Sequence, residues 1–159
     1  MATGSARQYG HAVPASMPAA FVLQWALEVA AEAGWWGARH HGGVVDPLRD
    51  GLSFALHPGW HHPVEVLVRD AGPAPALVED PLAAARAAYL VAGARLAAGQ
   101  EGVRLGRHQR LAMVPDVWAM VDARRRAQPP PARDSCCFIY VLPGAHECAG
   151  CPRLRRAAR

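Results

Sequence analysis

The stretch CCFIYVLPGAHECAGC, residues 136–151, contains all four cysteines of this 159-residue chain. Two adjacent cysteines are followed after ten residues by a third, and after two more by the fourth. Pro143 and Gly144 between the pairs favour a tight turn, with proline at its first central position and glycine at its second. Such a turn would bring the four thiols to one end of a hairpin. FIYVL before the turn has the β-branched and aromatic composition of a strand.

Four converging thiols are typical of a structural zinc site or an iron–sulfur cluster. Consecutive strand residues point to opposite faces, so Cys136 and Cys137 can share a centre only if the backbone bends or the centre is extended. A two-iron cluster is extended, whereas a zinc ion is compact. The spacing therefore favours an iron–sulfur cluster and leaves zinc and a redox-active dithiol or disulfide as alternatives. We expect Gly150 to supply the left-handed backbone that ligand loops often need.

The composition is that of one globular domain, with 52% hydrophobic and 19% charged residues. No basic start precedes an uninterrupted apolar run, so we predict no secretion signal. The most apolar region is broken by Gln24, Glu28 and Glu32, which argues against a transmembrane segment. We therefore predict a cytoplasmic protein, with attachment to the inner face of the membrane as an option. Clustered cysteines in a reducing compartment indicate metal binding rather than disulfides.

Positive charge gathers in the half of the chain that holds the cysteines. Residues 1–99 carry six arginines and eight acidic residues, whereas residues 100–159 carry eleven arginines and five acidic residues. Positive charge beside a cluster favours the added electron, and a basic face attracts acidic partners. A solvated surface is the alternative interpretation. The candidates for tuning a cluster or docking a partner are Arg133, His146, Arg153, Arg155 and Arg156.

The remaining sequence predicts an α+β fold, mostly helical, with a small antiparallel sheet and the C-terminal hairpin. Helical spacing of apolar residues predicts a helix from Ser16 that ends at Gly34 and Gly37. An Asp80-Pro81 start predicts a second helix to about Ala98. A third should run from about Gly106 to Ala127, with a break near Pro115. LSFALH and HPVEVLVRD, within residues 52–70, predict two strands.

This pattern divides the chain into a loose leader (1–15), a helical α+β domain (16–127) and a C-terminal part (128–159). The last part holds a Pro-rich spacer, the cysteines and an Arg-rich tail, and we expect it to pack on the same domain. Trp25, Trp35 and Trp36 recur on the first predicted helix and are expected in its core.

The pattern C-C-x10-C-x2-C, preceded by RDS and ending in CAGCP, resembles the C-terminal signature of the FhuF-type ferric-siderophore reductases. PASMPAAFVLQWAL and RLGRHQRLAMVPDVWAM resemble helical parts of that family more weakly, and the chain is shorter than typical members. The resemblance implies that one [2Fe-2S] cluster is bound by Cys136, Cys137, Cys148 and Cys151.

The resemblance further implies an iron–sulfur oxidoreductase that passes one electron to a ferric siderophore and releases Fe(II). It requires no catalytic residue beyond the cluster. No glycine-rich phosphate loop precedes a helix, so a separate ferredoxin-like or flavoprotein donor is expected. One alternative is a small [2Fe-2S] electron-transfer or accessory protein without siderophore activity. Another is a zinc-stabilised nucleic-acid-binding module, although the reductase interpretation expects no nucleic acid partner.

Overall fold

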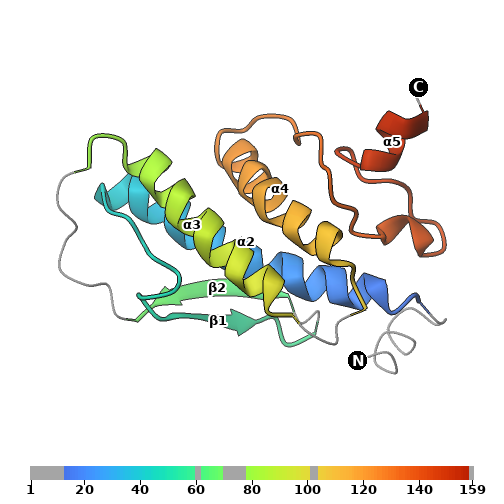
Figure 1. Ribbon diagram of the computed structural model, residues 1–159, viewed down its shortest axis with the longest axis horizontal. Coiled ribbons are helices and arrows are strands. Elements are labelled where there is room, and N and C mark those ends of the chain that lie inside the picture. The colour runs from blue at the N-terminus through green and yellow to red at the C-terminus, as the bar shows by residue number, and fades with distance from the viewer. Residues whose placement is uncertain (1–12, 60–61, 70–77, 101–103, 158–159) are drawn as a thin grey trace.

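A computed structural model of the chain describes residues 13–59, 62–69, 78–100 and 104–157. Residues 1–12 of the predicted leader lie outside this part. The predicted α+β class is confirmed: within the described ranges, three long helices carry a two-stranded sheet and a C-terminal segment (Figure 1). The elements are α2 (Ser16–His41), β1 (Leu52–Leu56), β2 (Pro63–Val68), α3 (Pro81–Ala98), α4 (Arg107–Arg125), the 3₁₀ turn η1 (Ile139–Val141) and α5 (Pro152–Ala157).

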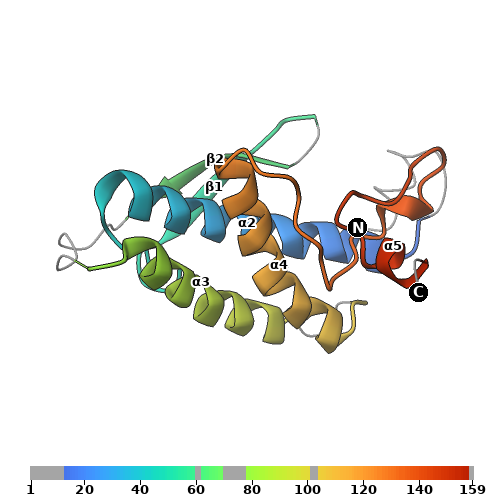
Figure 2. The same ribbon diagram turned by 90° about the horizontal axis from the view of Figure 1, so that it is seen from above.

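Helix α2 is the centre of the fold, with α3 and α4 packed on one side and the sheet on the other (Figure 2). The core lies among the three helices, which together form the helical body. Its α2 face is built from Leu27, Trp35 and small alanines such as Ala31, so the partner helices approach closely. The prediction that Trp36 lies in the core is wrong, because 47% of it is exposed on the opposite face.

Helix α2 does not end at Gly34 and Gly37, as predicted, but continues to His41. Both glycines are contact points. A Cβ at Gly34 would lie 3.5 Å from the Trp118 ring, and one at Gly37 would lie 2.7 Å from Val45 Cγ2. Tertiary packing therefore explains these glycines, and it overrides their low helix propensity. The helix ends at Gly42, whose φ of 63° is the left-handed conformation common after helices.

The other two helices begin close to where the sequence predicts. The Asp80 carboxylate accepts a hydrogen bond from the Ala83 N–H (3.0 Å), which caps α3. The predicted break at Pro115 is wrong, since α4 runs through it. In the turn before that proline, the buried Tyr89 hydroxyl donates to the Val114 carbonyl (2.9 Å) and joins α3 to α4. This contact holds α4 against α3 directly beside the position where proline removes a backbone donor.

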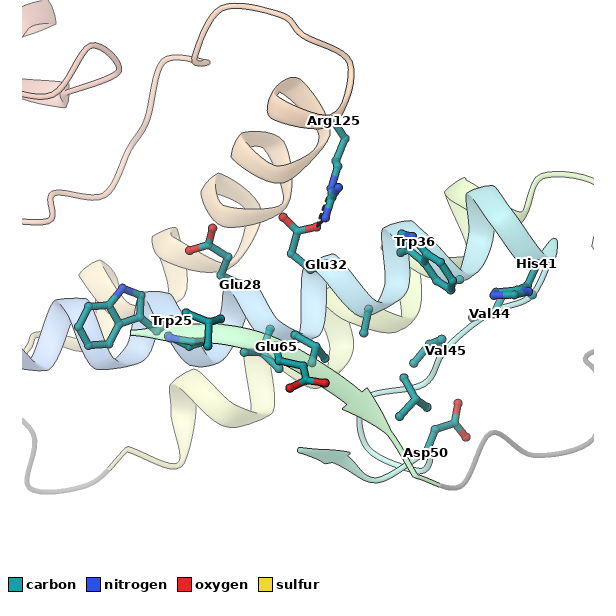
Figure 3. Close-up of a pocket in the computed structure, with 18 of the residues that line it drawn as sticks. Trp25, Glu28, Glu32, Trp36, His41, Val44, Val45, Asp50, Glu65 and Arg125 are labelled. Carbon is teal, nitrogen blue, oxygen red and sulfur yellow. Dashed lines mark hydrogen bonds and ion pairs between the residues drawn. The ribbon is translucent and has the colours of Figure 1, made fainter. Parts of the chain in front are cut away.

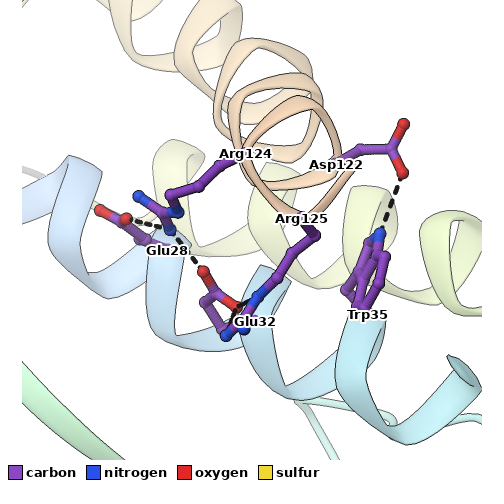
Figure 4. Close-up of polar contacts among 6 residues, drawn as sticks. All are labelled: Glu28, Glu32, Trp35, Asp122, Arg124 and Arg125. Carbon is purple, nitrogen blue, oxygen red and sulfur yellow. Dashed lines mark hydrogen bonds and ion pairs between the residues drawn. The ribbon is translucent and has the colours of Figure 1, made fainter. Parts of the chain in front are cut away.

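Polar contacts fix the C-terminal end of α4 against α2 (Figure 4). Arg124 donates to Glu28 (2.6 Å) and also to Glu32, which in turn accepts from Arg125. One turn along α2, Trp35 Nε1 donates to Asp122 (2.9 Å). These contacts set the direction in which the chain leaves α4 and returns toward its N-terminal half.

Strands β1 and β2 pair antiparallel, as predicted, with Leu52 opposite Val68 and Phe54 opposite Val66. Paired residues share a face, so this face of the sheet is apolar. Trp60 and His61, in the predicted turn between the strands, lie outside the described residues. No helix in the described ranges combines the length and the apolar character needed to cross a membrane.

Candidate metal centre

The cysteine segment, residues 128–157, runs back alongside α4 and packs near its N-terminal half (Figure 1). Two side chains of α4 hold it there. The Asp116 carboxylate accepts hydrogen bonds from the backbone N–H groups of Asp134 (3.0 Å) and Ser135 (2.7 Å). Nearer the N-terminal end of α4, Gln109 Nε2 donates to the carbonyl of Cys136 (2.7 Å). The helical body therefore positions the backbone on both sides of the first cysteine.

The predicted turn between the cysteine pairs is confirmed. The Ala145 N–H donates to the Leu142 carbonyl (3.0 Å) and Gly144 has a φ of 73°, as expected when proline and glycine occupy the centre of a type II turn. The segment nevertheless does not form a strand ladder: FIYVL, predicted as a strand, contains the 3₁₀ turn η1. Among the described residues the sheet consists of β1 and β2 alone, so the aromatic and branched residues of FIYVL have no neighbouring strand there with which to pair.

A bend directly follows the adjacent cysteines. Phe138 has a φ of 62°, a left-handed conformation that is costly for a residue with a side chain. The bend turns the Phe138 N–H back so that it donates to Cys136 Sγ (3.4 Å). The side chain of Phe138 packs against the helical core, which helps to hold the bend. The backbone bend required for adjacent cysteines to face one centre is therefore present.

Gly150 has a different role from the one predicted. Its φ does not lie in the left-handed region, so conformational freedom is not the reason for glycine. A Cβ at this position would collide with the backbone carbonyl oxygen of Pro131. The Arg133 N–H also donates to the Gly150 carbonyl (2.9 Å). Gly150 therefore allows the two limbs of the segment to touch, and this contact brings Cys151 back toward Cys136.

All four cysteines are free thiols, and each is at least partly buried. Cys136 interacts with Cys151 and Cys137. After burial, the neighbouring thiols of Cys137 and Cys151 raise the pKa of Cys148, so the two cysteine pairs lie close together. Within the described ranges, no group of three or more His, Cys, Asp or Glu side chains is arranged to hold a metal ion. The thiols therefore lie near one another, but in the described residues they are not yet arranged as a complete set of metal ligands.

Burial makes the Cys136 and Cys148 thiols weaker acids in the metal-free protein, because it raises the pKa of each. It is the largest cause that raises the pKa of Cys136, and the Phe138 N–H partly offsets it. Burial, followed by the neighbouring Cys137, raises the pKa of Cys148 to about 11, and the positive charge of Arg133 opposes that rise. Thiolate formation at this site therefore requires additional positive charge, which bound metal ions provide.

The structure separates the predicted tuning and docking residues. Arg133 is buried, and its Nη1 lies 3.9 Å from Cys148 Sγ. Arg153 is exposed, stacks 4.0 Å from the centre of the Tyr140 ring and pairs with Glu147 (3.3 Å). His146 is exposed beyond the turn. Arg155 and Arg156 belong to α5, but their side chains lie outside the described part.

A small hollow of about 210 Å³ opens beside Cys136. Its walls include Gln109, Tyr140 and Arg153, so a polar donor, an aromatic ring and a cation surround the approach to this thiol. The other three cysteines do not line the hollow. Cys136 is therefore the ligand candidate that a partner entering this hollow would meet.

A larger trough of about 900 Å³ lies between α2 and β2 (Figure 3). Trp25, Val29 and Trp36 form its apolar wall, and Arg124 at the far end of α4 also lines it. Gln109, which lines the hollow, and Arg124 are separated by about 22 Å of helix at the usual rise per residue. The trough is therefore distant from the thiols along α4, although it is the larger cavity.

Sequence reasoning missed Asp116, Ser135 and Gln109, the residues that anchor the segment. The sequence pattern could have indicated a role for Asp116, because a carboxylate on the apolar face of a helix needs buried hydrogen-bond partners. The local sequence around Ser135, directly before the adjacent cysteines, does not indicate its role. Its importance depends on a contact with α4 that local sequence does not reveal.

Comparison with known proteins adds one finding. Residues 133–153 match the family model described as the FhuF 2Fe-2S C-terminal domain. The resemblance seen in the sequence is confirmed for this segment, which is about an eighth of the chain. The match supports a [2Fe-2S] cluster as the cofactor, rather than zinc or a dithiol. No curated protein and no solved structure matches the chain.

The residues of the segment fit such a group. The donor set consists of four thiols, which are the usual ligands of iron–sulfur clusters. The backbone N–H of Phe138 and the guanidinium of Arg133 both face sulfur atoms of this set. Donors of this kind stabilise negative charge on ligand sulfur.

Proposed function

We propose that Cys136, Cys137, Cys148 and Cys151 bind the [2Fe-2S] cluster, and that the protein passes single electrons to a ferric siderophore. The hydrogen bond from the Arg133 N–H to the Gly150 carbonyl (2.9 Å) supports the ligand assignment, because it joins the two limbs of the segment that hold the two cysteine pairs. The match over residues 133–153 supports the chemistry. When bound, the cluster supplies a one-electron redox centre.

The hollow beside Cys136 is the proposed place of electron exchange. Tyr140 and Arg153 offer a flat aromatic and cationic edge to an oxygen-rich chelate or to an acidic donor protein. The ferric chelate gains one electron there and becomes Fe(II), which its hard oxygen ligands hold less tightly. A separate ferredoxin-like or flavoprotein donor supplies that electron. The trough is too far along α4 to be the first choice for this contact.

A small [2Fe-2S] carrier without siderophore activity is the second candidate. The size of the hollow favours it: about 210 Å³ is below the 300–1,000 Å³ of ordinary ligand pockets, so a chelate would be bound only at the surface. A protein partner needs no enclosing pocket. The two candidates predict the same cofactor and differ only in the electron acceptor.

The test begins with anaerobic purification, iron and zinc analysis, and visible spectra before and after dithionite. We expect two irons per chain and absorption bands that bleach on reduction. The reduced protein is then mixed with a ferric trihydroxamate chelate while a ferrous-specific chromophore traps Fe(II). Rapid reoxidation with one Fe(II) per electron supports the reductase. Stable reduced protein points to the carrier, and a colourless zinc protein would overturn both.

Serine substitutions test the ligands. Cys136→Ser and Cys137→Ser should each lose most of the iron and the visible bands. A serine hydroxyl is a poorer ligand for cluster iron than a cysteine thiolate. Ala149→Ser is the matched control, since it places a serine at an exposed position inside the same CAGC loop. Cluster content equal to wild type in both cysteine variants would contradict the assignment.

A further inference from the structure

A buried chain of polar contacts links α4 to the thiols. Ser135 Oγ donates to Asp116 Oδ2 (2.6 Å), and Arg133 Nη2 donates to Ser135 Oγ (3.4 Å). The other arm of the guanidinium, Nη1, faces Cys148 Sγ at 3.9 Å. The exposed fractions are 8% for Asp116, 0% for Ser135 and 5% for Arg133. Water is therefore largely excluded from Asp116 to Arg133.

The two ends of this chain carry opposite charges. Burying a carboxylate or a guanidinium is unfavourable unless each is paired and hydrogen-bonded. Asp116 meets this condition through the backbone N–H groups of Asp134 and Ser135 and the Ser135 hydroxyl. Ser135 joins the two charged groups, because its hydroxyl donates a hydrogen bond to the Asp116 carboxylate and accepts one from the Arg133 guanidinium.

The position of Arg133 matters for redox chemistry. Reduction adds one negative charge to a thiolate-ligated centre, and a nearby buried cation favours that addition and raises the potential. A guanidinium is held by hydrogen bonds in a fixed plane, so its effect depends on where those bonds place it. Ser135 Oγ accepts such a hydrogen bond from Arg133 Nη2, the arm of the guanidinium that does not face Cys148.

We propose that Ser135, itself fixed by Asp116, is a positioning residue that holds the Arg133 guanidinium against Cys148 and thereby raises the reduction potential of the centre. The inference rests on the proposed cluster ligands. It does not depend on which electron acceptor the protein uses. Asp116 lies on α4, so the helical body, and not the cysteine segment alone, sets the redox property.

The sign of the potential change distinguishes positioning from simple electrostatics. Removal of the negative charge in Asp116→Asn would by itself raise the potential. If Asp116 acts by fixing Ser135 and Arg133, the same variant loses the ordered cation and the potential falls. Ser135→Ala changes no formal charge, so electrostatics alone predicts no shift, whereas positioning predicts a lower potential. Arg133→Gln should lower it most, by at least a tenfold change in the reduction equilibrium, which is about 59 mV for one electron.

The experiment is a spectroelectrochemical titration of the loaded proteins, arranged as a double-mutant cycle. Ser135→Ala should lower the potential in wild type and have no further effect in the Arg133→Gln background. Arg126→Gln is the control, because it removes an exposed arginine at the far end of α4 and should leave the potential unchanged. Iron content and electron paramagnetic resonance spectra are measured on each sample.

Three results would overturn the inference. One is an unchanged potential in Ser135→Ala. Another is an equal shift of Ser135→Ala in both backgrounds, which would indicate a general structural effect. The third is loss of iron in Ser135→Ala and Asp116→Asn while Arg133→Gln loads normally, which would assign the pair to assembly of the segment. If wild type itself binds no [2Fe-2S] cluster, the proposed function has failed instead.

Discussion

The helical body and the cysteine segment are held in shape by different forces. In the body, periodic apolar side chains of α2, α3 and α4 pack into one core. In the segment, the described residues 128–157 contain one 3₁₀ turn and one short helix, and single contacts fix the backbone. Asp116, Gln109 and the carbonyl of Gly150 make the decisive ones. The core distributes its stability over many residues, whereas the segment depends on a few.

This difference indicates a division of labour. A packed core of this kind folds without a cofactor, because burial of apolar surface supplies the driving force. A segment fixed by isolated hydrogen bonds gains much of its order from metal binding, since a complete site rarely exists beforehand. We expect the body to keep its helices in the metal-free protein while the segment loosens.

Gly150→Ala is the substitution with the largest expected effect. Its methyl group would collide with a backbone carbonyl, which cannot move aside as a side chain can. The two limbs should separate, and we expect loss of most bound iron with little change in helical circular dichroism. Gly106→Ala is the matched control, because a Cβ there meets nothing within 4 Å. Iron loading as high as wild type in Gly150→Ala would break the proposed contrast between the regions.

Sequence reasoning was most successful for the body. The two strands and the start of α3 follow from local signals, namely alternation, turn residues and an Asp-Pro cap. It was less successful where tertiary contacts override such signals. Gly34 and Gly37 mark helix contacts rather than a helix end, and Pro115 lies inside α4. Trp36 has helical spacing but faces the trough, because alanines form much of the true core face.

For the cysteine segment, the chemistry could be predicted from the sequence better than the backbone conformation. Residue type and spacing indicated a cluster, and Pro143-Gly144 indicated the turn. The strand predicted in FIYVL was wrong, since strand propensity needs a partner strand to take effect. The anchoring by Asp116 could not be predicted, because it depends on how a distant part of the chain folds back on α4.

Leu27→Ala should have the next largest effect, and on the other region. Leu27 is fully buried on α2, so its truncation leaves a cavity that costs about 2–5 kcal/mol of unfolding free energy. We expect a lower midpoint in urea, while iron content per folded molecule stays at the wild-type level. Leu96→Ala, at a partly exposed site on α3, should change the unfolding free energy by less than about 0.5 kcal/mol. Equal loss of iron and stability in Leu27→Ala would show that the regions are not separable.

Tyr89→Phe should have the smallest effect, and it depends on pH. Burial raises the pKa of Tyr89 well above its ordinary value of about 10. The folded state therefore keeps the proton while the unfolded state releases it, so stability is fully present below about pH 10 and falls by about 1.4 kcal/mol per pH unit above it.

Near neutral pH, loss of the hydrogen bond to Val114 should cost about 0.5–1.5 kcal/mol. Urea unfolding of metal-free protein from neutral to alkaline pH measures both effects, and above pH 10 the wild-type curve should fall toward that of the variant, which lacks this titration. Tyr140→Phe, which removes a hydroxyl outside the helical core, is the control and should leave the unfolding free energy near neutral pH unchanged. Parallel curves for wild type and Tyr89→Phe would mean that the alkaline loss of stability arises elsewhere, with the thiols of the segment as the next groups to test.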